Sequence, residues 1–476
     1  MTMRDMKIEI IGSVTIKPSS PIPHNHKTLK LSLFDQLAPP SYVRLILFYS
    51  INNNDVIKTT TDQHHHQITS QKLKKSLSES LTLFYPFSGR IKSSISIELG
   101  DDHEDDIGAY YTEARIHCTL SSFLEQPDIE VLKHLHPIDQ PHDHDHQFSK
   151  DATSIPLLQV QVSFFERGGL AIGLSMSHKL TDAATISKFI SVWAAIAVGY
   201  EIPLVDFGAA SYFPPREHIS AFQPPSMIVK GPNKCVVKRR YVFDGTKIEA
   251  LREKAISQSV QRPSRVEAVT ALIWRCAMAA AWKKSTTSLN QKDAGDSSKK
   301  KKSIIIHLVN IRKRVKTPFL ENTMGNLVQQ FAVMTDESQM ELQDLVAQLR
   351  KGNIEFGENI DKLLEGDRLL EMIDQYRKEK EKKSGTRDVD GEEMMKLYSC
   401  SSWCRFGLYD IADFGWEKPI WISNTGSTKN NFFSLMDTKG GDGIEALITL
   451  SEEEMELFEK DPEFLAFASS NPRVLL

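Results

Sequence analysis

Leu174-Ser175-Met176-Ser177-His178-Lys179-Leu180-Thr181-Asp182 is the stretch in which a strand pattern gives way to a helix pattern. Upstream, apolar and polar residues alternate over 158–164 and again over 170–176, and Glu166-Arg167-Gly168-Gly169 separates the two runs. This pattern predicts a β-hairpin whose second strand delivers the chain to His178. Side chains at such a junction lie at the rim of a sheet, where substrates can reach them.

Beyond the junction, Asp182 begins a predicted helix that runs to about Tyr200. Its apolar face carries Ile186, Phe189, Ile190, Trp193 and Ala197. Aspartate suits the start of a helix because its carboxylate accepts hydrogen bonds from the first free amides. Asp182 therefore has a structural interpretation, and His178 can in the same way be an ordinary polar loop residue.

A functional interpretation of His178 rests on its chemistry. Histidine supplies both a neutral base and a cationic acid near neutral pH, so His178 can take the proton of a bound hydroxyl. Among the 15 histidines, His178 alone is followed by Asp at the fourth position. About one such spacing is expected by chance in a chain of this size. The spacing alone leaves both interpretations open.

Composition limits the class of protein. The 476 residues, 40% hydrophobic and 25% charged, are typical of globular proteins and sufficient for two domains. The net charge of -4 argues against binding of nucleic acid or an anionic membrane. We find no secretory signal and no apolar run that spans a bilayer. Five scattered cysteines indicate reduced thiols, so we expect a cytoplasmic protein.

A proline-rich stretch divides the chain. We expect an N-terminal domain over 1–205, a crossover over 206–234 and a C-terminal domain over 235–476. Residues 284–302 and 378–393 are polar and predict loops. The expected fold is α/β with mixed sheets. Predicted strands are 7–17, 42–50, 236–243, 303–309 and 444–450, and further helices are 73–83, 247–257 and 264–283.

The sequence lacks the motifs of several other enzyme classes. Gly-x-Ser-x-Gly is absent, which argues against a serine hydrolase, and neither a dinucleotide fingerprint nor a Walker loop is present. His64-His65-His66 and the histidines at 142, 144 and 146 lie in polar surroundings that predict solvated loops. Cys400 and Cys404 have no second pair at zinc-like spacing. We therefore predict no metal site.

Two later segments carry further candidates. Ser401-Ser402-Trp403-Cys404-Arg405 is followed by Asp413-Phe414-Gly415-Trp416, and this region can also be simply a packed aromatic corner. Asn310-Ile311-Arg312 precedes the pair Gly325-Asn326. From the residues alone, Arg312 can pair with a carboxylate or face solvent.

Taken together, these motifs resemble the plant BAHD acyltransferases in order and spacing. The resemblance spans essentially the whole chain, from Ile16-Lys17-Pro18-Ser19-Ser20-Pro21 to the glycines at 440–443, and includes Tyr85-Pro86-Phe87-Ser88-Gly89-Arg90. Leu31-Ser32-Leu33-Phe34-Asp35-Gln36-Leu37 and Ser402-Trp403-Cys404-Arg405 are most similar to the branch of alkaloid O-acetyltransferases.

The resemblance implies two chloramphenicol-acetyltransferase-like domains with a channel at their interface. An acyl-coenzyme A donor, most simply acetyl-coenzyme A, and a small-molecule alcohol acceptor meet there, and no cofactor is bound permanently. It implies His178 as general base, Asp182 as a structural partner of Arg312, and an oxyanion held by Ser401 and Trp403. Asp413, Phe414, Gly415 and Trp416 then support the coenzyme A side. The cofactor-binding residues stay unknown, and we expect a monomer.

Two positions depart from the family pattern. Ala183 follows Asp182 where the family usually has Gly, and Glu417 replaces the usual Gly after Trp416. If position 417 takes a positive φ, a glutamate is strained there. We expect an O-acyltransferase acting on a plant alkaloid or related metabolite. The alternatives are transfer from a hydroxycinnamoyl or benzoyl donor, and a non-acylating binding protein.

Overall fold

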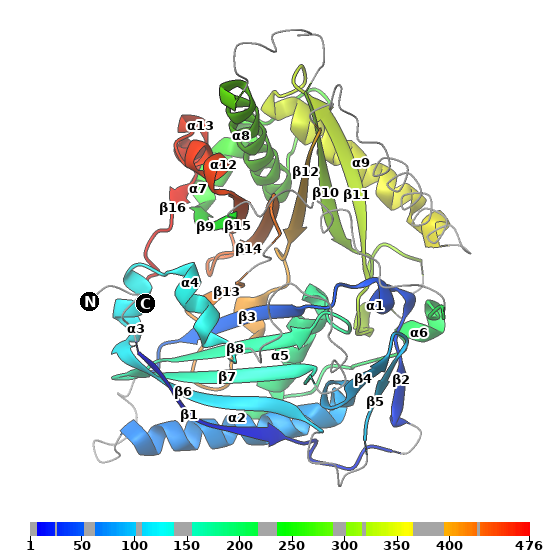
Figure 1. The fold of residues 1–476 in the computed structure, drawn as a ribbon, viewed down its shortest axis with the longest axis vertical. Helices are drawn as coiled ribbons and strands as arrows, with labels where there is room; N and C mark the ends of the chain where they lie inside the picture. The colour runs from blue at the N-terminus through cyan, green and yellow to red at the C-terminus, as the bar shows by residue number, and fades with distance from the viewer. Residues whose placement is uncertain are drawn as a thin grey trace.

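The structure is a computed structural model that describes residues 7–23, 26–51, 62–100, 107–137, 155–217, 236–288, 301–316, 320–364, 395–425 and 429–476. Two large sheets form its two halves, one above the other (Figure 1). Both sheets mix parallel and antiparallel pairs, and helices cover them. The predicted α/β class with two sheet-bearing domains is confirmed.

The first sheet has six strands, in an order that leaves the predicted hairpin at its centre. α2 (Asp62–Leu83) and α5 (Ala183–Val198) pack on one face, while α3 (Leu120–Glu125) and α4 (Ile129–Leu132) pack on the other. β6 and β7 run parallel, and the remaining pairs are antiparallel. The order is β1 (Ile8–Ile16), β6 (Ala109–Thr119), β7 (Leu158–Glu166), β8 (Leu170–Ser177), β3 (Tyr42–Tyr49) and β13 (Trp421–Ser423).

The second sheet has seven strands and belongs to the second half. Five helices pack on one face of it: α7 (Gly245–Lys254), α8 (Arg265–Ser288), α9 (Leu342–Leu364), α12 (Glu452–Phe458) and α13 (Pro462–Phe467). The strand order is β11 (Val328–Asp336), β10 (Lys302–Asn310), β12 (Met395–Ser402), β14 (Phe432–Asp437), β15 (Ile444–Ser451), β9 (Val236–Phe243) and β16 (Ser469–Ser470).

Smaller elements surround the two sheets. β2 (Thr28–Lys30), β5 (Ser96–Glu98) and β4 (Arg90–Ser93) form a separate three-stranded sheet. The short helices are α1 (Leu33–Leu37), α6 (Ala209–Tyr212) and α11 (Leu408–Ile411). Among the described residues, no helix is long and apolar enough to cross a membrane.

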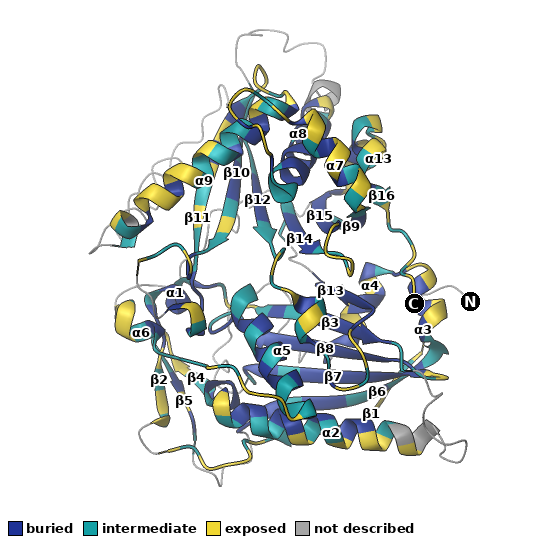
Figure 2. Cartoon of the chain, turned by 180° about the vertical axis from the view of Figure 1, so that it is seen from behind, coloured by how far each residue is buried: buried dark blue, intermediate teal, exposed yellow. Residues whose placement is uncertain are grey.

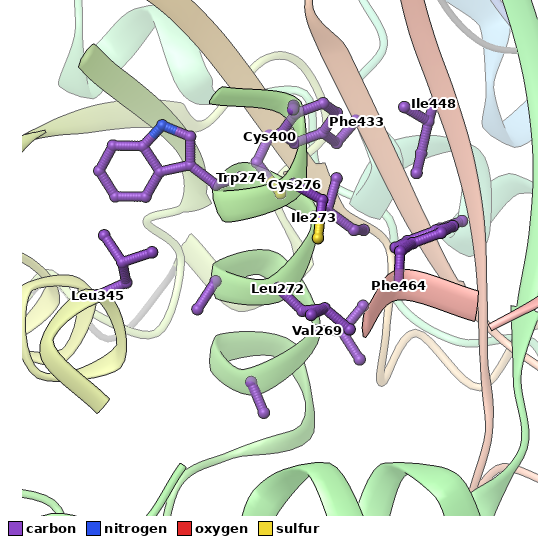
Figure 3. Close-up of a cluster of buried hydrophobic side chains, with 14 of the residues drawn as sticks. Val269, Leu272, Ile273, Trp274, Cys276, Leu345, Cys400, Phe433, Ile448 and Phe464 are labelled. Carbon is purple, nitrogen blue, oxygen red and sulfur yellow. The ribbon is translucent and has the colours of Figure 1, made fainter. Parts of the chain in front are cut away.

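Helix α8 lies at the centre of the second core. Its small and aliphatic residues let it sit close against β12, β14 and β15, and Trp274 extends toward α9 (Figure 3). The Trp274 indole N–H donates to the Ser303 hydroxyl at 2.8 Å, so the buried ring keeps a polar partner. Buried residues run through both sheets, and exposed ones lie on the outer helix faces (Figure 2).

One strand crosses between the halves. β13 pairs with β3 and so completes the first sheet, although it lies far into the second half of the sequence. Its neighbours Leu408, Ala412 and Phe414 are also buried in the core of the first sheet. The boundaries at 205 and 235 stay a prediction, but they do not account for this exchange of chain between the halves.

Several predicted elements need correction at their ends. The helix expected at 73–83 is part of α2, so His64, His65 and His66 lie in a helix rather than a loop. Helix α5 ends at Val198 because Gly199 takes φ 76, which glycine adopts without strain. The histidines at 142, 144 and 146, the loop 378–393 and most of the crossover lie outside the described residues.

Candidate active site

His178 follows directly on the last residue of β8. Its backbone N–H donates to the Ser41 carbonyl at 2.8 Å, which holds it at the end of the sheet beside β3. Thr181 then forms a bridge with Gly325 of the second half. Asp182 caps helix α5 by accepting from the Thr185 N–H at 2.8 Å. The junction therefore lies where the two halves meet.

Asn326, from the second half, fixes the His178 ring. Its Oδ1 lies 3.0 Å from His178 Nδ1, and its Nδ2 donates to the His178 carbonyl at 2.6 Å. Because Nδ2 also donates to Asp35, the amide has only one orientation that satisfies its neighbours. Oδ1 therefore accepts the Nδ1 proton, and the neutral ring carries its lone pair on Nε2.

Asp35, on α1, holds the Asn326 segment in place. Its Oδ1 accepts from the Asn326 backbone N–H at 2.7 Å and from Asn326 Nδ2 at 3.0 Å. Its Oδ2 accepts from the Ser32 backbone N–H and hydroxyl. Gly325 has φ 107, and a Cβ there would lie 3.1 Å from both Asp35 oxygens. Glycine is therefore required at position 325, both for its positive φ and because a side chain there would crowd Asp35.

Burial shifts the pKa of His178. The side chain is half-buried, and desolvation lowers its pKa from the ordinary value, with a further lowering from the positive charge of Lys429. The hydrogen bond with Asn326 and the charge of Asp182 oppose the shift. The neutral imidazole, which is the form that accepts a proton, is therefore favoured at neutral pH.

Asp182 and Arg312 form a buried ion pair between the halves. Arg312 Nη1 donates to Asp182 Oδ2 at 2.6 Å, and both side chains are almost fully buried. Arg312 also donates to the Thr323 and Gly325 carbonyls, each at 2.9 Å. No hydrogen bond in the described part of the chain joins Asp182 to the His178 ring. The pair instead braces the segment that carries Asn326.

The electrostatics of this pair follow from its surroundings. Burial by itself raises the pKa of the Asp182 carboxyl, but Arg312 more than offsets it, helped by the N–H groups of Thr185 and Leu327. The pKa of Asp182 is therefore below its ordinary value. The carboxylate accepts from Leu327 N–H at 3.1 Å in addition to its other donors. A buried charge with this many donors is well satisfied.

Ser401 and Trp403 come from the end of β12. Ser401 pairs with Leu308 of β10 and with Ser434 of β14. The Trp403 backbone N–H donates to the Leu435 carbonyl at 2.7 Å, and its ring packs against the core that includes β8 and α5. Among the described hydrogen bonds, neither residue contacts His178. Their predicted role as oxyanion donors stays a prediction.

The segment Asp413-Phe414-Gly415-Trp416 is anchored to the first half. Phe414 packs edge-on against Trp193 of α5 at 4.9 Å between ring centroids, and stacks with Trp416. Lys72 of α2 donates to the Phe414 carbonyl at 2.7 Å and lies over the Trp416 ring. Asp413 accepts from the Gly415 N–H at 2.8 Å. These contacts make the segment a loop that packs against α2, α5 and β3.

Glu417 occupies a strained backbone position. Its φ is 88, and the side chain is exposed. We expect Glu417→Gly to raise the free energy of unfolding by about 1 kcal/mol, because glycine adopts this φ without strain. The relief of strain exceeds the opposing effect of glycine, which increases the conformational entropy of the unfolded chain. Urea unfolding measures this change. Glu417→Ala is the matched control, since it removes the carboxylate but keeps the strained Cβ. An equal gain in both variants would contradict the strain explanation.

The sequence did not reveal the roles of Asp35 and Asn326. Both residues lie in segments that the resemblance quoted, yet no local pattern links them to His178. Ser32 and Asp35 have capping-box spacing, and the structure has that box. In the described residues, no group of three or more His, Cys, Asp or Glu side chains is arranged to hold a metal ion.

Comparison with known proteins shows the family and the fold of this chain. A profile of the Transferase family matches residues 6–465. Limonoid 7-O-acetyltransferase of Citrus sinensis is 34% identical, over 98% of this chain and 99% of that protein. Stemmadenine O-acetyltransferase of Catharanthus roseus is 33% identical, over 96% of this chain and 97% of that protein. Vinorine synthase, known from a crystal structure, is 31% identical in sequence. The two structures superpose with a TM-score of 0.76, over 98% of this chain and 99% of that chain.

Proposed function

The chain belongs to the Transferase family of BAHD acyltransferases, which use acyl-coenzyme A as co-substrate, and we propose that it acetylates a hydroxyl of a plant alkaloid or related specialised metabolite. The acetyl donor is supported by the names of the two relatives, both O-acetyltransferases. The observation that carries the proposal is the fixed His178 ring at the meeting point of the two halves, with Asn326 on Nδ1.

In this mechanism His178 is the general base. Nε2 removes the proton of the acceptor hydroxyl while the oxygen attacks the thioester carbonyl carbon. The thioester is already activated, so no covalent enzyme intermediate is needed. The proton on Nε2 then passes to the departing sulfur, which restores the neutral ring. General acid–base catalysis of this kind contributes roughly a hundredfold to ten-thousandfold.

The remaining residues position these groups. We assign Ser401 and Trp403 as donors to the oxyanion, which forms at the boundary of the two sheets. Asp182 and Arg312 keep the Asn326 segment against His178 through the contacts described above. Both substrates meet in a channel between the halves. Binding them side by side in the reactive orientation lowers the entropic cost of bringing them together.

The lowered pKa of His178 predicts the pH dependence. The base must be neutral, so activity falls as pH drops through its pKa. Because burial lowers that pKa, the acid limb of kcat/KM should have its midpoint below about pH 6.5, the ordinary value for histidine. Steady-state rates across a pH series measure it. A midpoint above 6.5 would contradict a desolvated neutral base.

A competition assay tests the proposed donor. Purified protein is incubated with equal concentrations of acetyl-, hydroxycinnamoyl- and benzoyl-coenzyme A and a panel of alkaloid alcohols, and the products are identified by mass spectrometry. We expect acetyl esters to dominate. Products that carry the bulkier acyl groups would replace this proposal by the alternative donor class. N-acylated products from an amine panel would in turn replace the hydroxyl as acceptor.

A further inference from the structure

Lys179 follows the candidate base directly, and its side chain binds the end of helix α1. Its Nζ donates to the Gln36 carbonyl at 2.8 Å and to the Ala38 carbonyl at 2.7 Å. Both carbonyls lie at the C-terminal end of α1. The proton transfer proposed above does not use Lys179, so a half-buried lysine beside the base has no assigned role.

The sequence leaves these two carbonyls without local donors. A carbonyl at the end of a helix can accept from an N–H three or four residues later. For Gln36 these positions are Pro39 and Pro40, which carry no N–H. For Ala38 the third position is Ser41, whose N–H donates to the Pro39 carbonyl instead. Among the described hydrogen bonds, only the lysine ammonium donates to the two carbonyls.

Helix α1 carries the contact that fixes the base. The Ser32 capping box holds its first turn, and the ammonium of Lys179 holds its last. From this helix Asp35 accepts from the Asn326 backbone N–H and from Nδ2, and Asn326 Oδ1 lies 3.0 Å from His178 Nδ1. Lys179 and His178 are consecutive in the chain, so these contacts close a ring that runs from the base through α1 and back.

The position of α1 depends on contacts of this kind. The helix lies at the boundary of the two halves and has 5 residues, too few to hold a helix in place by its own hydrogen bonds (Figure 1). Phe34 is buried with Leu327 of the second half. The Gln36 side chain exchanges hydrogen bonds with the Arg216 backbone at 2.9 and 2.8 Å. These contacts and the ammonium together determine where Asp35 lies.

Burial also affects the charge of Lys179. Desolvation lowers the pKa of Lys179 to about 8, and the charge of Asp35 on α1 opposes the shift. Among the described charged groups, Asp35 is the only one that acts on this lysine. An ammonium donates stronger hydrogen bonds to carbonyls than a neutral amine does. The hold on α1 is therefore strongest at neutral pH and weakens as pH rises through about 8.

We propose that Lys179 is a positioning residue for acyl transfer, which fastens α1 so that Asp35 and Asn326 keep the lone pair of the base on Nε2. This inference rests on the proposed function, in which His178 is that base. Lys179 acts on the reaction only through α1. Its loss of charge then gives activity an alkaline limb, in addition to the acid limb that His178 determines.

Lys179→Met tests this role because it removes the charge and keeps most of the side-chain length. We expect kcat to fall roughly tenfold to a hundredfold and KM for acetyl-coenzyme A to stay within about twofold, since a misplaced base slows the chemical step without weakening donor binding. Lys351→Met, which changes an exposed lysine on α9, is the matched control and should alter neither constant. An unchanged kcat in Lys179→Met would overturn the proposal.

Lys179→Arg separates the effect of charge from that of side-chain shape. Arginine stays charged across the measured pH range, so this variant should retain most of the activity at neutral pH. Its alkaline limb, which in the wild type has a midpoint at about pH 8, should disappear. Steady-state rates across a pH series measure both effects. An alkaline limb that persists at the same midpoint in Lys179→Arg would contradict the assignment to Lys179.

The tautomer of the His178 ring distinguishes this inference from the proposed function. Proteins with isotope-labelled histidine are compared by NMR, and the signal missing from His178→Ala identifies the ring. The wild type should carry the proton on Nδ1, and Lys179→Met should show a mixture of tautomers, whether or not any acceptor turns over. Lys179→Arg should restore the wild-type signal. The Nδ1 tautomer alone in Lys179→Met would overturn the inference, and so would loss of the signal in both variants, which indicates damage to the fold.

Discussion

His178→Ala should lower kcat for acyl transfer by about a thousandfold while leaving the fold intact, within the range that a general base contributes. The physical reason is specific to this ring. Asn326 holds the proton on Nδ1, so truncation removes the one lone pair that accepts the hydroxyl proton. KM for the donor should change little, because the His178 ring acts on the acceptor hydroxyl. Steady-state release of free thiol measures both constants.

His117→Ala is the matched control for this prediction. His117 lies on β6 beside the edge strand β1, where it pairs with Glu9 at 3.0 Å in a solvent-exposed setting. Its removal should leave kcat unchanged, because this ion pair lies at the protein surface and takes no part in the proposed chemistry. Retained turnover in His178→Ala would rule out His178 as the base.

Arg312→Met should have the largest effect on stability, lowering the free energy of unfolding by about 3–5 kcal/mol. The substitution leaves the Asp182 carboxylate buried without its cation, while the Thr323 and Gly325 carbonyls lose their donor. Activity should fall as well, since the Asn326 segment loses its brace. Urea unfolding followed by far-UV circular dichroism measures the loss.

The double variant Asp182→Asn with Arg312→Met provides the control. Asparagine keeps the cap of α5 and removes the orphaned charge, so the double variant should be more stable than Arg312→Met alone. The stability of the wild type also depends on pH through Asp182. Because the pKa of Asp182 is lowered in the folded protein, its carboxylate stabilises the wild type above about pH 3.9, and this contribution is lost as pH falls through the folded pKa. A double variant no more stable than the single one would contradict the assigned pair.

Much of the fold follows from local patterns in the sequence. Alternation over 158–164 and 170–176 predicts the central hairpin, and apolar residues at helical spacing predict α5, because each pattern matches the period of its element. The position of β13 is different. Three residues joined to β3 from the far end of the chain carry no periodic signal, since their pairing is set by tertiary contacts.

The candidate site is likewise only partly predictable from the sequence. His178 and Asp182 lie at a strand-to-helix junction that the sequence reveals. Asn326 is 148 residues from His178 and 291 residues from Asp35, and no spacing rule connects residues at such separations. The resemblance paired Asp182 with Arg312, and the residues alone left Arg312 open.

Mass spectrometry of acceptors after incubation with acetyl-coenzyme A tests the central claim most directly. Wild-type protein and His178→Ala are each incubated with acetyl-coenzyme A and a plant extract, and products are compared with those of a heat-inactivated control. The account predicts a metabolite that gains one acetyl group with the wild type and remains unmodified with His178→Ala. Coenzyme A binding by calorimetry without any acylated product, or equal product from both proteins, would contradict it.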